Sequence, residues 1–287
     1  MANGYVLFNE KAGNGRGKEG IEGLTKYFKA PLCYLDMTAL EGGYKGLFAK
    51  MEKDDFLVLC GGDGTINCFI NDAGEEALSF AVWYFPTGSG NDFAKEMGRD
   101  RGAEPFLIND YLKDQPTVTV KGKKWRFLNG VGYGIDGYCC EKGDELRAQS
   151  TKKVDYTSIA IKGLLFYYKP TSAVVTVDGK EYRYKKVWIA PTMKGKYYGG
   201  GMIPTPGQDR MDKDGTLSVM IFHDSSKLKT LMIFPSIFKG EHVKNEKYVT
   251  VLTGKKITVA FDAPRPLQID GETVKDVSSY TAVSGKE

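Results

Sequence analysis

The sequence predicts two domains, an α/β domain followed by a largely antiparallel β domain. Over the first 120 residues, apolar segments and glycine-rich turns alternate with helix-like segments. Beyond that point the segments become short, β-branched and closely spaced. The 287 residues are about two domains' length, enough to bury a core without disulfides or metals. We place the domains at residues 1–118 and 119–274, and residues 275–287 could complete the first.

The first domain is expected to contain a Rossmann-like parallel sheet, because strands and helices alternate along the chain. The segment at 56–60 is a continuous apolar run, which is typical of a strand covered by helices on both faces. The expected strands are residues 5–8, 32–35, 56–60 and 80–85, and the expected helices lie near 19–28, 44–52, from 65 onward, and 92–97.

The second domain is expected to be an antiparallel β-sandwich, because its short alternating segments are separated by Gly, Asp, Asn and Lys turns. Helices are expected only near 156–167 and 228–238. The expected strands are residues 118–120, 173–177, 185–190, 217–222, 247–252 and 256–261.

Composition excludes several classes of protein. At 41% hydrophobic and 26% charged residues the chain is neither disordered nor fibrous, and its apolar runs are too short to span a bilayer. The N-terminus lacks the features of a signal peptide. Five cysteines without a CxxC pair predict reduced thiols in a cytoplasmic protein. Two histidines leave little for zinc or Ser-His-Asp chemistry, and no nucleic-acid partner is expected.

The net charge of +4 is unevenly distributed. Acidic residues outnumber basic ones in residues 1–120, and basic residues outnumber acidic ones in residues 121–287. This is either ordinary solubility charge or a sign that the basic half approaches an anionic membrane surface, where each nearby Lys or Arg gains about 1 kcal/mol.

The first glycine-rich loop, residues 9–18, resembles two nucleotide-binding patterns but fits neither. Gly15–Gly20 matches GxGxxG, yet it begins too far after the strand for a dinucleotide fingerprint. A Walker A loop fails because Glu19 follows Lys18. What remains is a basic, glycine-rich loop before a helix, which could hold a phosphate.

Two further glycine loops are stronger candidates. Gly61–Thr65 follows the third expected strand and Pro86–Ala94 follows the fourth, and each contains an Asp. Glycine lets backbone N–H groups approach a polyphosphate closely. Helix capping by Asp, Asn or Thr is the alternative interpretation for either loop alone. Together the loops favour a nucleotide's phosphates with their Mg²⁺.

These loops carry a resemblance to a known family. Gly61–Thr65 with Asn67, and Pro86–Ala94, resemble the diacylglycerol kinase catalytic family, which includes sphingosine and ceramide kinases; the bacterial lipid kinases look closest. The likeness extends over nearly the whole chain. Its other segments are Asn129–Asp136, Tyr197–Met202, Asp214–Leu217 and Ile269–Glu272.

The resemblance implies an NAD kinase/diacylglycerol kinase-like fold and an ATP- and Mg²⁺-dependent kinase whose two domains meet at a cleft. It implies a lipid substrate at the membrane surface, peripheral contact with the inner membrane, and pairing into a homodimer. Asp270 would be the general base, assisted by Glu272, and Asp92 would lie near the transferred phosphate and its Mg²⁺. Asp270-Gly271 taken alone predicts a hairpin turn. The implied nucleotide-binding residues are Asn9, Gly13, Thr38, Gly61, Gly62, Asp63, Gly64, Thr65, Gly88, Gly90 and Asn91.

The resemblance also implies a structural Mg²⁺ site formed by Asp214, the Thr216 carbonyl and Asp212. The same loop is not an EF-hand, because Arg210 stands at the first ligand position and Ile221 at the last.

Two positions depart from the family pattern. Glu10 replaces a proline and Cys68 replaces a glutamate. The alternatives to a lipid kinase are therefore a kinase of NAD or another small alcohol, for which Gly61–Thr65 alone would suffice, and a nucleotide-binding regulator with weakened catalysis.

Overall fold

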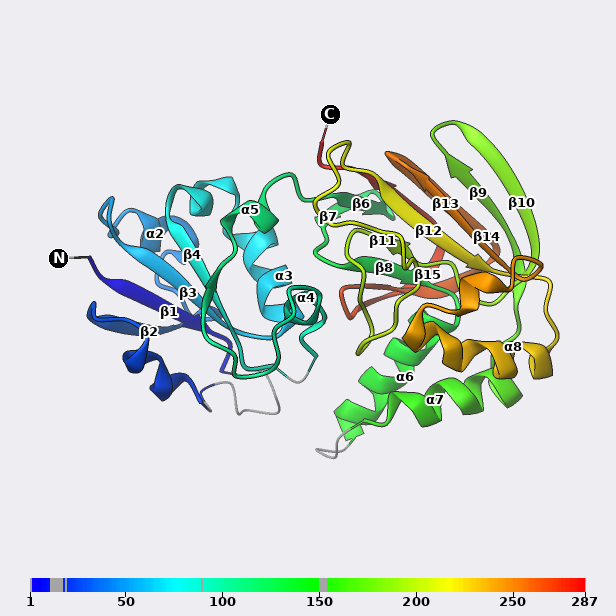
Figure 1. Cartoon of the computed structure of the whole chain (residues 1–287), viewed down its shortest axis with the longest axis horizontal. Coiled ribbons are helices and arrows are strands. Elements are labelled where there is room, and N and C mark those ends of the chain that lie inside the picture. The colour runs from blue at the N-terminus through cyan, green and yellow to red at the C-terminus, as the bar shows by residue number, and fades with distance from the viewer. Residues whose placement is uncertain (1, 11–17, 19, 89, 150–153, 287) are drawn as a thin grey trace. The chain divides into compact units, whose positions relative to one another are not determined.

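The computed structural model describes residues 2–10, 18, 20–88, 90–149 and 154–286. The chain divides into two compact units, Met1–Lys113 and Asp114–Glu287. Each has its own sheet and its own core (Figure 1). The division falls five residues before the predicted boundary at 118/119, because the strand that begins at Thr117 already belongs to the second sheet.

The first unit contains a five-stranded sheet in the order β2-β1-β3-β4-β5. Its first four strands are parallel, as predicted, and the short edge strand β5 runs antiparallel to β4. Central β3 is the most completely buried strand, in agreement with its continuous apolar sequence. The bounds are β1 Gly4–Phe8, β2 Leu32–Asp36, β3 Phe56–Gly61, β4 Ala81–Pro86 and β5 Phe106–Leu107.

The four predicted helices of the first unit are found, three of them shorter than predicted, and two further short helices, at 75–79 and 109–112, were not predicted. Gly42 before α2 and Gly43 at its start both have positive φ, and the helix expected near 19–28 is a short 3₁₀ helix. The helices are η1 Ile21–Lys26, α2 Gly43–Phe48, α3 Asp63–Asp72, η2 Glu75–Ser79, α4 Asp92–Glu96 and α5 Asn109–Leu112.

The second unit contains a ten-stranded sheet, antiparallel throughout, with order β13-β12-β11-β8-β14-β15-β6-β7 and β10-β9 attached to β14. The 14-residue β14 pairs with β9 through its first half and with β8 through its second, on either side of an irregularity after Ala260. The bounds are β6 Thr117–Val120, β7 Lys123–Arg126, β8 Gly130–Tyr133, β9 Thr171–Val177, β10 Lys180–Val187, β11 Thr192–Met193, β12 Leu217–Phe222, β13 Val249–Gly254, β14 Lys256–Ile269 and β15 Glu272–Val283.

The predicted antiparallel β domain is confirmed, and its ten strands are hydrogen-bonded into one sheet that folds over its own core. Val118 on β6, Val175 on β9 and Val219 on β12 come from distant parts of the strand order, yet they share one buried core. A sheet can enclose its own apolar face in this way only if it bends, and the irregular part of β14 provides the bend.

Helices cover the second unit's sheet at one end (Figure 1). Leu164, Ile233 and Ile237 pack with Trp188 and Met220 of the sheet region in a second core. Two of the helical segments were predicted, whereas α6 was not, because its glycines and charged residues obscure the helical pattern. They are α6 Ile135–Gln149, α7 Tyr156–Lys162 with η3 Gly163–Tyr167, α8 Lys227–Ile233 with η4 Phe234–Lys239, and η5 His242–Lys244.

The expectation that residues 275–287 complete the first domain is wrong for those that the structure describes. β15 pairs with β14 over most of its length and with β6 at its end. Ser284 Oγ then donates to the Gly215 carbonyl at 2.6 Å. Hydrogen bonds therefore hold this segment in the second unit. All five cysteines are free thiols, as predicted.

Candidate functional site

Parallel strands bring the candidate loops of the first unit to one edge of its sheet. The chain leaves β1 toward β2 on one side, while β3 and β4 lie on the other, so the strand order reverses between β1 and β3. In open α/β sheets, ligands bind outside the carboxyl ends of the strands at such a switch point. The loops after β1, β3 and β4 all start at this edge.

The loops after β3 and β4 are in direct backbone contact. A Cβ added to Gly88 would lie 2.4 Å from Gly62 Cα, and one added to Gly62 would lie 2.9 Å from the Gly90 carbonyl oxygen. Thr87 and Gly88 also donate backbone N–H groups to the Gly61 carbonyl at 2.9 Å. Gly61, Gly62 and Gly88 therefore allow two loops to pack as one surface.

The Asp63 side chain joins the same two loops. Its carboxylate accepts the backbone N–H groups of Asp92 at 2.8 Å and Phe93 at 2.9 Å, at the start of α4. Asp63 thus caps the helix of the neighbouring loop rather than its own helix, α3. A carboxylate at a helix N-terminus also interacts favourably with the helix dipole, which explains an acidic residue among so many N–H groups.

Asn91 is held within its own loop. Its side-chain amide donates to the Gly88 carbonyl at 2.9 Å. The hydroxyl of buried Tyr84 lies 3.2 Å from Asn91 Oδ1 and 3.1 Å from the Gly61 carbonyl. Asn91 and Tyr84 therefore set the shape of the loop.

Other predicted residues leave room for a ligand. Among the described residues, chain neighbours and the helix's own backbone aside, no heavy atom lies within 4 Å of a Cβ built on Gly64 or Gly90, and both glycines are exposed. Gly64 lies in the first turn of α3, where backbone N–H groups lack helical partners. Thr65 is instead buried, with its hydroxyl over Gly61, and Asp92 is buried at 6% exposure.

On the other side of the switch point, Asp36 connects the loops after β1 and β2. Asp36 Oδ1 accepts the Thr38 backbone N–H at 3.0 Å, the Thr38 hydroxyl at 2.9 Å and the Glu10 N–H at 3.5 Å. Glu10 forms a 2.9 Å ion pair with Lys18. Asn9 is half-buried beside this connection, whereas Gly13 lies outside the described residues.

In the second unit, Asp270 occupies the hairpin between β14 and β15. Asp270 and Gly271 have φ values of 46° and 97°, which indicates the two-residue turn that Asp-Gly favours. Unlike an ordinary turn residue, Asp270 bonds a distant segment. Its Oδ1 accepts N–H groups from Asn129 at 2.8 Å and Gly130 at 3.0 Å, and its Oδ2 accepts the Leu128 N–H.

Arg210 is part of this arrangement and was missed in the sequence. It is 2% exposed, and its guanidinium donates to the Leu128 carbonyl and to Asn129 Oδ1, both at 2.5 Å. Its side chain thereby orders the segment that holds Asp270. In the sequence, Arg210 stood out only because it occupies a position where a calcium-binding loop would have an acidic residue.

Gln268 and Asp136 form a second buried pair near the hairpin. Gln268 donates to Asp136 Oδ2 at 2.9 Å and accepts the Gly271 N–H at 2.6 Å. Burial raises the pKa of Asp136 to about 6, although the Gln268 amide acts in the opposite direction. Glu272, the first residue of β15, is exposed.

The residues of the expected structural metal site share a loop, and two of them, Asp212 and Thr216, are hydrogen-bonded to each other. Asp212 Oδ2 accepts the Thr216 N–H at 2.8 Å and the Thr216 hydroxyl at 2.6 Å. The Lys286 ammonium donates to the carbonyls of Asp212 at 2.9 Å and Lys213 at 3.3 Å. Within the described part of the chain, no three His, Cys, Asp or Glu side chains cluster for a metal. Two carbonyls of this loop therefore already have a cationic partner, Lys286.

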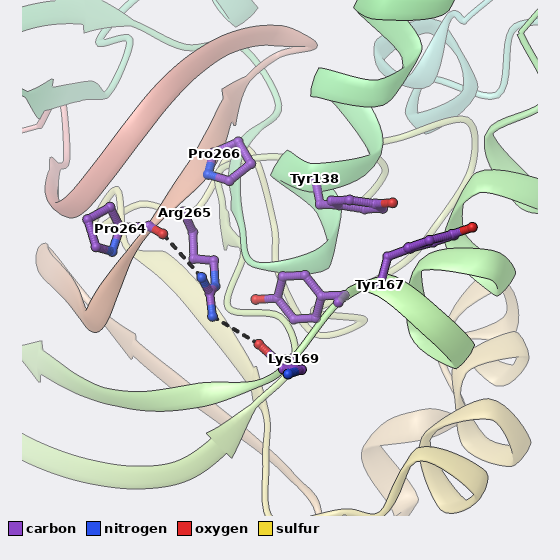
Figure 2. A pocket seen from close by; sticks show the side chains of 7 residues that line it. Tyr138, Tyr167, Lys169, Pro264, Arg265 and Pro266 are labelled. Atoms are coloured by element: carbon purple, nitrogen blue, oxygen red, sulfur yellow. Dashed lines mark hydrogen bonds between the residues drawn. The ribbon is translucent and has the colours of Figure 1, made fainter.

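The second unit also contains a pocket of about 260 Å³ beside its helices. Its lining includes three tyrosines and the cationic residues Lys169 and Arg265. Figure 2 shows the Arg265 guanidinium directed at the Lys169 carbonyl, to which Nη2 donates at 3.1 Å. The tyrosines are Tyr138, Tyr167 and Tyr168.

Comparison with known proteins identifies the family. The diacylglycerol kinase catalytic domain matches residues 3–119, and the YegS C-terminal NAD kinase beta sandwich-like domain matches residues 129–285. The two matches cover the two units in turn, so the chain belongs to the diacylglycerol kinase-like family whose C-terminal domain is of the YegS type. A kinase of this family uses a nucleotide as its phosphate donor.

Similar proteins agree with this assignment. The chain is 28% identical over 227 residues to proteins named "Putative lipid kinase" from Staphylococcus aureus strains Mu3 and Newman, covering 76% of this chain and 70% of theirs. Two crystal structures titled as a putative diacylglycerol kinase from Bacillus anthracis have TM-scores of 0.61 and 0.62 at 17% and 18% identity. They cover 99% of this chain and 94% of theirs. At that identity they support the fold alone.

Proposed function

We propose that the protein is an ATP-dependent lipid kinase that transfers the γ-phosphoryl group to the hydroxyl of a lipid such as diacylglycerol. The observation that carries the proposal is the backbone contact between the two glycine loops at the switch point. Such a surface suits a chain of phosphates, because its glycines let phosphates approach the loop backbone without side chains in the way. Family membership supports a lipid acceptor.

The described contacts divide the proposed nucleotide residues into two groups. Gly64, Gly90, Asn9 and Thr38 would contact the nucleotide. The remaining described ones would shape the loops: Gly61, Gly62, Asp63, Thr65, Gly88 and Asn91. For Gly13, a role in nucleotide binding is proposed from the family resemblance alone.

Asp92 is the proposed ligand of a catalytic Mg²⁺. Mg²⁺ is typically bound by one or two carboxylates together with substrate phosphates, so a single buried carboxylate beside a phosphate loop fits this ion. When bound, Mg²⁺ would neutralise charge on the phosphates. Asp92 would also keep its backbone bond to Asp63, which fixes its position.

Asp270 is the proposed general base. The lipid hydroxyl oxygen would bond to the γ-phosphorus, the bond to the β,γ-bridging oxygen would break to release ADP, and the hydroxyl proton would pass to Asp270. Three backbone N–H groups hold this carboxylate in place. They also stabilise its charge, so it would accept the proton late, when the hydroxyl has become acidic. Glu272 would assist. Asp270 belongs to the second unit and the glycine loops belong to the first.

The test is turnover by the full chain with ATP, Mg²⁺ and a bacterial lipid extract, followed by mass spectrometry. We expect a phosphorylated lipid alcohol. The Asp270→Asn variant should lose at least about 10²-fold in rate, the usual effect of removing a general base. The matched control is Asp276→Asn, an exposed Asp with φ 52° on the same hairpin, which should keep full activity. Unchanged turnover in Asp270→Asn would eliminate Asp270 as the base.

The same assay distinguishes the alternatives. NADP formation from NAD without any lipid product would favour a small-molecule kinase. ATP binding by calorimetry without turnover on any acceptor would favour a regulator, for which Cys68 in α3 is the supporting observation.

A further inference from the structure

Two helical segments of the second unit are apolar on both sides. In α8–η4, Ile233 and Ile237 are buried, yet Leu228 is 69% and Met232 61% exposed. In η3, Leu164 is buried, whereas Phe166 and Tyr167 are each 69% exposed. Helices with apolar side chains all round are normally buried. These segments already contribute side chains to the core, and their outer apolar side chains remain exposed in the described part of the chain.

The two segments form one surface. η3 and α8 pack together (Figure 1), and Lys227 Nζ at the start of α8 donates to the Leu165 carbonyl of η3 at 3.0 Å. We call this surface the apolar helix face. Its exposed members are Ile161, Leu165, Phe166, Tyr167, Leu228, Met232 and Phe238.

Every charged residue within these segments is a lysine. Residues 156–169 and 225–240 contain no Asp or Glu. By contrast, α6 carries internal ion pairs, Lys142–Glu145 and Arg147–Asp144, as an ordinary solvated helix does. Five cations around exposed aromatic and aliphatic groups complement a surface that is both apolar and anionic. The lysines are Lys162, Lys169, Lys227, Lys229 and Lys239.

The pocket in Figure 2 adjoins this face, because Tyr167 belongs to both and Lys169 lies in its lining. Within the pocket, Arg265 Nε and the Tyr168 hydroxyl are buried, the two side chains interact with each other, and neither atom forms a hydrogen bond of good geometry to a described residue. Unpaired buried donors are costly, so a ligand that accepts hydrogen bonds would stabilise them. A phosphate on the anionic surface has the required oxygens and charge.

We propose that the apolar helix face docks on a bilayer containing anionic phospholipid, with one lipid headgroup phosphate bound in the Arg265 pocket. The exposed side chains enter the boundary between headgroups and acyl chains, while the lysines contact lipid phosphates. A second copy of the chain is a poorer partner, because two such faces would oppose ten lysines. Docking itself does not depend on catalysis. That docking brings an enzyme to its lipid substrate rests on the proposed function.

The first test is co-sedimentation of the full chain, without nucleotide, with phosphatidylcholine vesicles prepared with and without phosphatidylglycerol. We expect binding that requires phosphatidylglycerol and weakens with salt. The double variant Phe166→Ser, Tyr167→Ser should lose about tenfold or more in affinity. The control is Leu107→Ser, an apolar residue of the first unit at 49% exposure, which should bind like wild type.

The second test addresses the pocket. Arg265→Gln should bind phosphatidylglycerol vesicles several-fold more weakly, and Arg265→Lys, which keeps the charge, should recover part of the loss. Equal binding by all three proteins would overturn the headgroup site. Unfolding midpoints of each variant show whether it is folded, since Arg265 also bonds backbone carbonyls.

Three outcomes would overturn the docking proposal: no vesicle binding, binding indifferent to anionic lipid, or unchanged binding by the double variant. A wild-type dimer by light scattering that the double variant converts to monomer would assign the face to a second copy. If vesicle binding succeeds but no lipid is phosphorylated, the proposed function fails and the docking surface stands. Short-chain substrate dispersed in detergent should be turned over equally by wild type and the double variant.

Discussion

At the scale of single residues, acidic side chains connect segments that are far apart in sequence. Asp63 bonds backbone groups 29 and 30 residues away, and Asp270 bonds groups 140 to 142 residues away. In both cases the carboxylate accepts hydrogen bonds from backbone N–H groups that would otherwise need other acceptors. The Asp63 side chain therefore acts on the nucleotide loops by shaping them.

Removing the Asp63 carboxylate should separate the two loops. Asp63→Ala leaves the first N–H groups of α4 without an acceptor and should lower the free energy of unfolding by about 1–2 kcal/mol, as loss of a helix cap does. Urea unfolding measures the change, and nucleotide affinity should fall with it. Asp54→Ala, at an exposed position before β3, is the control. A stable variant with weakened nucleotide binding would indicate direct contact instead.

Asp136 should make stability depend on pH. Its pKa is about 6 in the folded protein and near 4 when unfolded, so the folded state prefers the neutral acid. The contribution is fully present below about pH 4 and is lost as pH rises through about 6. Asp136→Asn should remove roughly 2–3 kcal/mol of this dependence. Urea unfolding at pH 4, 5, 6 and 7 measures it, and an unchanged profile would contradict the assignment.

At the scale of elements, the site depends on how closely two loops approach. Gly62 and Gly88 leave no room for a side chain at their contact, whereas Gly64 and Gly90 face open space. Glycines in one loop thus have two functions, packing and ligand access. Their spacing along the chain does not separate the two.

A pair of alanine substitutions separates these functions. Gly88→Ala should destabilise the protein by several kcal/mol, because its Cβ would meet the backbone of Gly62 rather than a movable side chain. Gly90→Ala meets nothing within 4 Å and should unfold like wild type while weakening nucleotide binding. Thermal unfolding with and without ATP tests both. Equal stability of the two variants would refute the packing role.

At the scale of the whole molecule, each unit is held together by contacts between sequence-distant parts. In the second unit, β14 and β15 run through the sheet, and the residues after β15 return to the loop at Asp212–Thr216. The Lys286 side chain lies against Gly215 and donates to that loop's carbonyls. Within the described residues, no helix is long and apolar enough to cross a membrane.

We expect the Lys286 ammonium to stabilise the loop at Asp212–Thr216, as a bound metal ion would. Lys286→Met should lower the free energy of unfolding by about 1 kcal/mol, since a charge-assisted bond to backbone is lost at a partly exposed position. Lys213→Met, in the same loop and using only its backbone carbonyl, should have no effect. Adding Mg²⁺ or EDTA should leave the thermal midpoint of the wild type unchanged. Stabilisation by Mg²⁺ would restore the metal site.

The two-domain order, the parallel sheet and the loops of the candidate nucleotide site could all be predicted from the amino-acid sequence. These follow from local properties, namely strand periodicity and glycine placement after strands. The sequence did not reveal α6, the membership of β15 in the second sheet, or the partners of Asp63 and Arg210. The glycines and charged residues of α6 obscure its local pattern, whereas the others depend on hydrogen bonds between residues far apart in the chain, which no local pattern encodes. For the same reason, the sequence does not show whether a carboxylate in a glycine loop binds a ligand or accepts hydrogen bonds from the backbone around the ligand.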